Sequence, residues 1–163
     1  MNGTTDNINQ SLQRSSLAEG LTEEQCLNLA KIIETRELTD REALITEGQT
    51  DNCLYVIVEG RLEVTRDVSG GEWLTLAVLK EGDFAGEMGF IDGTKHSATL
   101  RAMGETQVLT LSRDALESLI DTDPHAVYKL MQNIVRTVHK ILMRMNQQYV
   151  EMNNYISKQH GRY

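Results

Sequence analysis

The chain has 163 residues, of which 40% are hydrophobic and 25% charged, a composition typical of one globular domain and not of a disordered chain. Its formal net charge of −8 argues against nucleic acid as the partner of the whole molecule. No apolar run approaches the roughly 18 residues that a bilayer span needs, and residues 1–10 contain no apolar signal-peptide core. We therefore expect no membrane span and a cytoplasmic location.

Residues 1–16 are rich in Asn, Thr, Ser and Gln and have little to bury, so we expect a flexible arm. A first helix is predicted to begin at Thr22, because Thr22 and Gln25 have the spacing of a capping box. Over residues 36–111 apolar residues then recur at every second position, with turn residues between the runs, which is the period of β-strands. The runs comprise Ala43 and Ile45, Leu54 to Val58, Leu62 and Val64, Leu74 to Val78, 97–103 and 106–111. This pattern predicts a mainly β domain of barrel or jelly-roll type with flanking helices over residues 17–122.

Two further helices are predicted after the strands. The first is capped near Ser112 and ends near Ile120; the second begins with Asp123 as N-cap and Pro124 at its first position. Neither Gly nor Pro interrupts residues 125–160, so we expect 123–163 to be one long helical segment. An apolar stripe about 35 Å long follows this helix. Its members are Ile134, Val138, Ile141, Met145, Tyr149, Met152 and Ile156.

The apolar stripe has two interpretations: packing on the chain's own β domain, or pairing with the same helix of a second copy. We expect the first half of the helix to lie on the β domain, and the part beyond Met145 to form a homodimer through the stripe. The mean spacing of the stripe lies nearer 3.67 than 3.5 residues, so the spacing does not decide whether the two helices would form a tight left-handed coiled coil. The basic residues of the helix lie on the opposite face, which is either solvated or a contact for the acidic body of a neighbouring copy or for an anionic partner. They are Lys129, Arg136, Lys140 and Arg144.

The segment with recognisable chemistry is FAGEMGFIDGTKHSATLRA, residues 84–102. It predicts a strand, a tight turn at Gly86, one helical turn over 87–91, a hinge at Gly93 and a returning strand from Ser97. The N-terminus of a short helix presents free N–H groups, which suit a phosphate. The Glu87 carboxylate can accept hydrogen bonds from ribose hydroxyls, and the backbone of Ser97 and Ala98 can contact the phosphate from the other side. The glycines Gly86 and Gly89 have a second interpretation, backbone geometry alone.

This segment resembles the phosphate-binding cassette of the cyclic nucleotide-binding domain family, found in the catabolite activator protein and in protein kinase A regulatory subunits. Residues 55–64 resemble a strand pair of that family, and residues 80–87 resemble the segment that leads into the cassette. In all, the similarity runs from about Leu21 to at least Val138. The resemblance implies an eight-stranded β-roll that binds cAMP or cGMP and signals by moving its C-terminal helix. It also implies which residues contact the ligand. Glu87 would bind the ribose hydroxyl, while Gly86, Met88, Gly89, Ser97 and Ala98 would surround the cyclic phosphate.

The sequence departs from the family pattern at the residue that grips the phosphate, where His96, preceded by Lys95, replaces an arginine. Arginine offers a permanently charged fork, whereas histidine offers one nitrogen. Loss of a charge-assisted contact of roughly 1.5–3 kcal/mol weakens binding by about 10- to 150-fold. A second departure lies on the long helix, where Ile141 and Leu142 occupy the slots of hydroxyl side chains that contact the purine in bacterial transcription-factor members.

Two functions follow from these observations. The first is a stand-alone regulatory domain that senses cAMP or cGMP weakly and signals through its C-terminal helix to a partner protein. The second is a degenerate member that binds no ligand and acts as a dimerising scaffold or docking module. No catalytic triad, carboxylate pair or metal-spaced cluster is recognisable, so we expect neither an enzyme nor a metal site. No helix-turn-helix sequence follows the long helix before Tyr163, which disfavours direct control of transcription.

Overall fold

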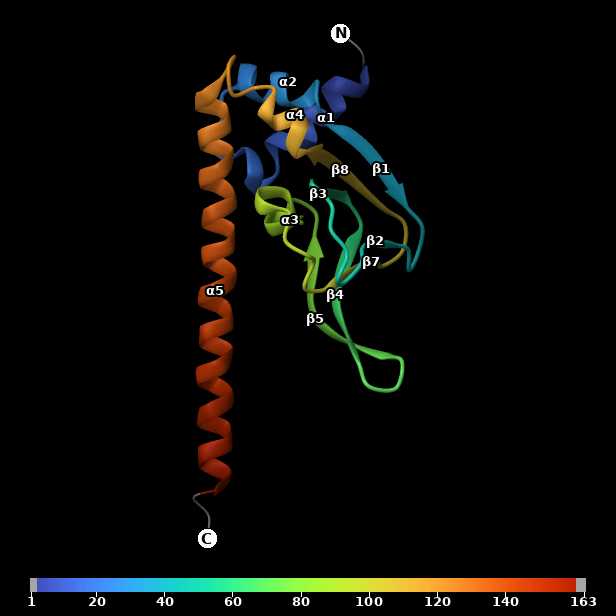
Figure 1. Cartoon of the computed structure of the whole chain (residues 1–163), viewed down its shortest axis with the longest axis vertical. Coiled ribbons are helices and arrows are strands. Elements are labelled where there is room, and N and C mark those ends of the chain that lie inside the picture. The colour runs from blue at the N-terminus through green and yellow to red at the C-terminus, as the bar shows by residue number, and fades with distance from the viewer. Residues whose placement is uncertain (1–2, 161–163) are drawn as a thin grey trace.

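The computed structural model describes residues 3–160, and its strands form two four-stranded antiparallel sheets (Figure 1). The first sheet has the order β1 (Glu34–Leu38), β8 (Thr106–Ser112), β3 (Cys53–Glu59), β6 (Phe84–Ala85). The second has the order β2 (Ala43–Ile45), β7 (Thr99–Ala102), β4 (Arg61–Val68), β5 (Glu72–Lys80). The expected eight-stranded β-roll with flanking helices is therefore confirmed.

The helices lie at one end and along one side of the roll (Figure 1). They are α1 (Gly3–Gln13), η1 (Ser16–Ala18, a 3₁₀ turn), α2 (Glu23–Ala30), α3 (Glu87–Asp92), α4 (Arg113–Glu117) and α5 (Pro124–His160). Helix α5 runs past the roll and extends beyond the β4–β5 hairpin (Figure 1). Among residues 3–160, no helix combines the length and apolarity that crossing a membrane requires.

The N-terminal segment differs from the flexible arm that the composition predicts. Within its described part, residues 3–13 form helix α1, and the side chains of Ile8 and Leu12 are 7% and 0% exposed. These two residues stand four apart, so they lie on one face of the helix and pack with Leu17 in the core. The expectation of an arm was wrong because a polar helix needs few apolar residues when a neighbouring surface covers them.

The predicted helix starts are confirmed by their caps. The Thr22 hydroxyl accepts from the Gln25 N–H at 3.2 Å, and the Gln25 side chain accepts from the Thr22 N–H at 3.0 Å. Ser112 caps α4, and the Asp123 carboxylate accepts from the Ala126 N–H at 2.9 Å at the start of α5. Local side-chain chemistry therefore determines where these helices begin.

Strand β3 is the centre of two hydrophobic cores. Leu54 and Val56 face the helices α1, α2 and α5, whereas Tyr55 and Ile57 lie between the two sheets. All four side chains are at most 5% exposed. The strand is thus buried on both faces and holds the loop that precedes it in a fixed position.

Most of the large apolar residues of β5 lie on the outside of the roll. Leu74, Leu76 and Val78 are 57%, 52% and 47% exposed, while Leu79 packs against the core between the sheets. The alternation correctly predicted a strand. Which of its faces is buried depends on the pairing with β4 and on the bulge between Val64 and Thr65.

Helix α5 is anchored to the body through its first half. Leu130 and Ile134 are fully buried, and the Asn133 amide donates to the carbonyls of Leu17 and Glu19, both at 2.8 Å. The prediction that Ile134 lies in the dimer interface is therefore wrong, because residues of its own chain cover this side chain. Beyond Val138 the apolar side chains are largely exposed; residues 161–163 lie outside the described residues.

Candidate functional site

The cassette turns sharply at Gly86, between β6 and α3. Its backbone has a φ of 89°, in the left-handed region that favours glycine. A Cβ at this position would lie 2.7 Å from the Cys53 carbonyl oxygen and 3.2 Å from the Tyr55 ring. Backbone geometry is therefore enough to require glycine here, and a contact between Gly86 and a ligand stays a prediction.

Replacing Gly86 with alanine is expected to lower the free energy of unfolding by about 2–4 kcal/mol, because left-handed strain and the clash with the Cys53 carbonyl act together. Gly104 is the matched control: it has a φ of 80°, but a Cβ there meets nothing within 4 Å. Gly104→Ala should cost the strain alone. Urea denaturation of both variants measures the difference, and equal losses would show that no clash exists at Gly86.

The side chain of His96 lies in a narrow niche behind α3. It is 8% exposed, and a Cβ on Gly89 would lie 2.9 Å from its Cε1 atom. The backbone of His96 is fixed by two hydrogen bonds to the loop before β3. The His96 N–H donates to the Gln49 carbonyl, and the His96 carbonyl accepts from the Gly48 N–H, both at 2.8 Å. Gly89 is thus needed to leave room for the imidazole.

Asp51 is the charged neighbour of this imidazole. Its Oδ1 lies 3.3 Å from His96 Nε2, close enough for an ion pair, although the ring N–H is not aligned for a hydrogen bond to any described group. The carboxylate is fixed by the Tyr55 hydroxyl at 3.0 Å and the Cys53 N–H at 3.1 Å. Burial, reinforced by the Asp51 charge, raises the pKa of the Tyr55 phenol, which therefore remains a hydrogen-bond donor.

The first turn of α3 offers acceptors and donors to a ligand. The first intrahelical bond runs from the Phe90 N–H to the Gly86 carbonyl at 2.9 Å, so the N–H groups of residues 87–89 have no acceptor within the helix. Among residues 3–160 the Glu87 carboxylate has no hydrogen-bond or ion-pair partner, and it is partly exposed. Met88 beside it is 48% exposed.

The predicted contacts from the other side of the cassette follow His96 in the chain. Ser97 is exposed and Ala98 partly exposed, immediately before strand β7. The structure therefore brings Gly86, Glu87, Gly89 and His96 into one cassette and places Ser97 and Ala98 at its return. Their ligand contacts remain predictions.

Ile141 and Leu142, the predicted purine-contacting residues, lie on the part of α5 beyond its anchorage. Ile141 is partly buried and Leu142 is 52% exposed. Helix α5 packs against the body before these two residues, over residues 127–138. A role for these two residues in binding a base stays a prediction.

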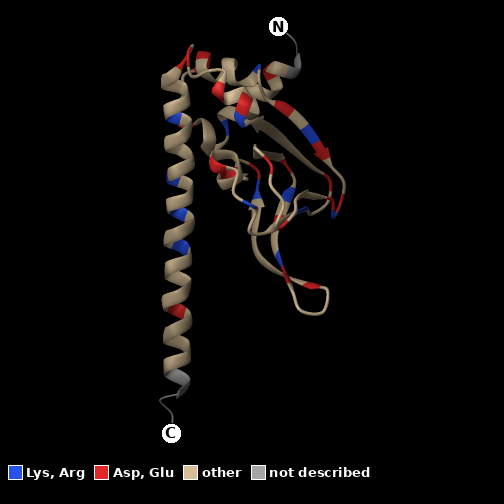
Figure 2. Ribbon diagram, in the orientation of Figure 1, with Lys and Arg blue, Asp and Glu red and all other residues tan. Residues whose placement is uncertain are grey.

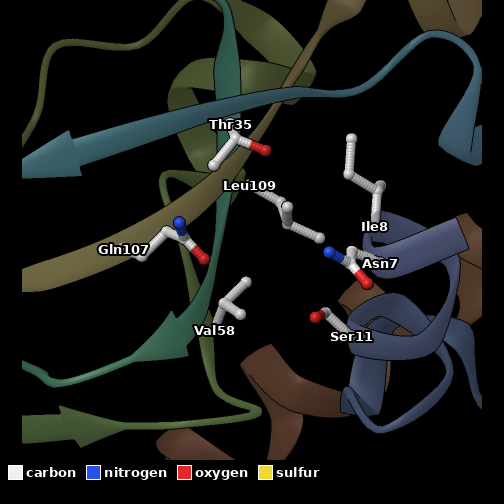
Figure 3. Close-up of a pocket in the computed structure, with 7 residues that line it drawn as sticks. All are labelled: Asn7, Ile8, Ser11, Thr35, Val58, Gln107 and Leu109. Carbon is white, nitrogen blue, oxygen red and sulfur yellow. The ribbon is translucent and has the colours of Figure 1, made fainter. Parts of the chain in front are cut away.

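A separate cavity of about 210 Å³ lies between α1 and the outer face of the first sheet (Figure 3). Asn7, Ile8 and Ser11 of the helix face side chains of strands β1, β3 and β8 across it (Figure 3). None of the described residues that line this cavity is charged, so they provide no counter-charge for a phosphate. The candidate site is therefore the cassette and not this cavity.

Sequence reasoning missed two residues at the cassette, Asp51 and Arg113. Asp51 lies in the loop before β3, and Arg113 is the first residue of α4. The guanidinium of Arg113 contacts the carboxyl end of α3, with Nε 2.6 Å from the Phe90 oxygen. Their distance in sequence from residues 84–98 left no local signal of these contacts.

Comparison with known proteins identifies the family. A family model described as "Cyclic nucleotide-binding domain" matches residues 35–123. The cAMP-dependent protein kinase regulatory subunit of Yarrowia lipolytica is 31% identical over 110 residues, which are 68% of this chain and 25% of that protein. The Cyclic AMP receptor protein of Thermus thermophilus is 26% identical over 129 residues, 79% of this chain and 60% of that protein. The chain thus spans less than two thirds of these relatives.

Solved structures agree with this assignment at the level of the fold. A cyclic nucleotide-binding domain from Methylobacillus flagellatus superposes with a TM-score of 0.79 at 24% identity, covering 91% of this chain and 83% of that one. The matched range 35–123 contains every strand except the first residue of β1, together with α3 and the His96 niche. The chain belongs to the cyclic nucleotide-binding domain family.

Proposed function

We propose that this chain is a regulatory domain that binds cAMP or cGMP weakly at the cassette and passes the ligand state to a partner protein through α5. The observation that carries the proposal is the first turn of α3, with unpaired N–H groups beside a Glu87 carboxylate that has no partner among residues 3–160. The N–H groups suit a cyclic phosphate and the carboxylate suits a ribose hydroxyl. Both relatives named above are described as cAMP proteins, which supports the choice of ligand.

The proposal is tested by calorimetric titration with cAMP and cGMP. We expect binding by the natural chain, and a loss of about 10-fold or more in Glu87→Gln, because an uncharged acceptor makes weaker hydrogen bonds to the ribose. Glu24→Gln, an exposed position in the first turn of α2, is the matched control and should leave the affinity unchanged. Equal affinities in all three proteins would place the ligand elsewhere.

The second candidate function, a dimerising scaffold without ligand, is favoured by the position of His96. Its ring is nearly enclosed between Gly89 and Asp51, so its Nε2 atom is directed toward a carboxylate of its own chain. A phosphate would compete with that carboxylate for the imidazole. Absence of heat with either nucleotide, in the natural chain and in a His96→Arg variant, would favour the scaffold. In both functions the chain is proposed not to be an enzyme.

We also propose that α5 pairs with α5 of a second copy. The seam that supports this consists of Val135, Val138, Leu142, Met145, Tyr149 and Met152, at spacings of 3, 4, 3, 4 and 3 residues. All but the partly exposed Val138 are more than half exposed. This spacing is the 3.5-residue period of a left-handed coiled coil. The basic residues Lys129, Arg136, Lys140 and Arg144 lie outside it, on a helix with one acidic residue after Pro124 (Figure 2).

The seam replaces part of the stripe expected from the sequence. Val138, Met145, Tyr149 and Met152 are common to both, whereas Ile134 is covered by its own chain. Leu142, expected at the purine, belongs to the seam by its spacing and exposure. The partner that receives the signal and a cytoplasmic location stay predictions.

A further inference from the structure

Arg113 joins two elements that are 20 residues apart in sequence. It is the first residue of α4, directly after the N-cap Ser112. Its Nε donates to the Phe90 carbonyl at 2.6 Å, and its Nη2 donates to the Gly89 carbonyl at 2.8 Å. The guanidinium therefore caps the carboxyl end of α3 from outside that helix.

This cap compensates for the small size of α3, which has six residues. So short a helix has little stability of its own, and its last carbonyls carry a partial negative charge. The Gly89 carbonyl also accepts from the Gly93 N–H at 2.9 Å, where the helix ends in a left-handed residue. A cation fixed at this end opposes rotation or fraying of α3.

The loop before β3 connects Arg113 with the opposite end of the cassette. The Asn52 side-chain oxygen accepts from Arg113 Nη2 at 3.2 Å, and the Asn52 carbonyl accepts from the Arg113 N–H at 2.8 Å. The preceding residue is Asp51, whose carboxylate lies 3.3 Å from His96 Nε2. Asn52 thus contacts Arg113, which caps α3 at the helical end of the cassette. Asp51 contacts His96, which lies where the chain leaves the cassette toward β7.

We propose that Arg113 is the positioning residue of the cassette: it fixes the direction of the α3 N–H groups toward the phosphate and joins α3 to the start of α4. Its three side-chain hydrogen bonds use the planar fork of arginine, which lysine does not reproduce. Helix α4 leads within a few residues to Asp123, the cap of α5, so a displacement of α3 reaches the proposed output helix through Arg113. The role in ligand binding rests on the proposed function.

The experiment compares Arg113→Gln and Arg113→Lys with Arg41→Gln, which removes an exposed guanidinium from a loop that follows β1. Hydrogen exchange of the Phe90 and Gly93 amides reports on α3 without any ligand, at a temperature where all variants are folded by circular dichroism. We expect exchange at least about 10-fold faster in Arg113→Gln, an intermediate rate in Arg113→Lys and no change in Arg41→Gln.

Calorimetry with cAMP then tests positioning. We expect the affinity of Arg113→Gln to fall by about 10- to 100-fold, and that of Arg113→Lys to fall less. Unchanged exchange at α3, or faster exchange with unchanged affinity, would overturn the proposal, because α3 would then be held or oriented by other groups. If the natural chain binds no cyclic nucleotide, the proposed function fails, and the exchange rates alone decide whether Arg113 holds α3.

Discussion

Replacing His96 with arginine is expected to tighten binding of cAMP by about 10- to 150-fold, the value of a charge-assisted hydrogen bond of roughly 1.5–3 kcal/mol. Arginine keeps its charge at all relevant pH values and offers several donors. The Asp51 carboxylate, 3.3 Å from the present ring nitrogen, would pair with one side of the fork and leave the other for the phosphate. Calorimetric titration of the two proteins measures the gain.

The groups facing the His96 ring are the Asp51 carboxylate and, through it, the Tyr55 hydroxyl. Equal affinities of the natural chain and His96→Arg for cAMP would exclude position 96 from the phosphate contact.

Introducing charge into the α5 seam is expected to abolish the dimer. Leu142 is 52% exposed in the single chain, and burial of a leucine side chain contributes about 1.5–3 kcal/mol. The position occurs twice in a dimer, so Leu142→Glu should raise the dissociation constant by at least about 100-fold. Analytical ultracentrifugation over a range of protein concentrations measures this constant.

The matched control for this variant is Lys140→Glu, two residues earlier on the same helix and outside the seam. It changes the charge of α5 more than Leu142→Glu does, yet it should leave the dimer intact. Ile141→Ala distinguishes the seam from the stripe expected from the sequence, since Ile141 belongs to the stripe alone. A dimer sensitive to Ile141→Ala and not to Leu142→Glu would contradict the seam.

Local patterns in the sequence predicted much of the fold. The period of two residues identified the strands, and the capping residues Thr22, Ser112 and Asp123 marked where helices begin. These signals are local, because a cap or a strand period is determined by residues within a few positions of each other. The turn at Gly86 belongs to the same class, since its positive φ requires glycine.

Apolar patterns in the sequence were less informative about which face of a helix or strand is buried, because burial depends on the segments that cover that face. Helix α1 was missed because Ile8 and Leu12 count for little until the body provides a surface for them. The row from Leu74 to Val78 has the period of a buried strand face, yet it lies outside the roll. On α5 the sequence offered overlapping apolar rows, and the burial of Ile134 removed one of them from the dimer interface.

The sequence by itself determined the cassette: its glycines, Glu87 and His96, which the resemblance places at the family's arginine position. What the tertiary structure decided is how that histidine is held. Asp51 and Arg113 reach the cassette from segments 45 and 17 positions away from His96, and residues 51–52 of the loop before β3 contact both His96 and Arg113. Contacts between distant segments leave no periodic or local signal, so the charge balance of the site became visible only in the folded chain.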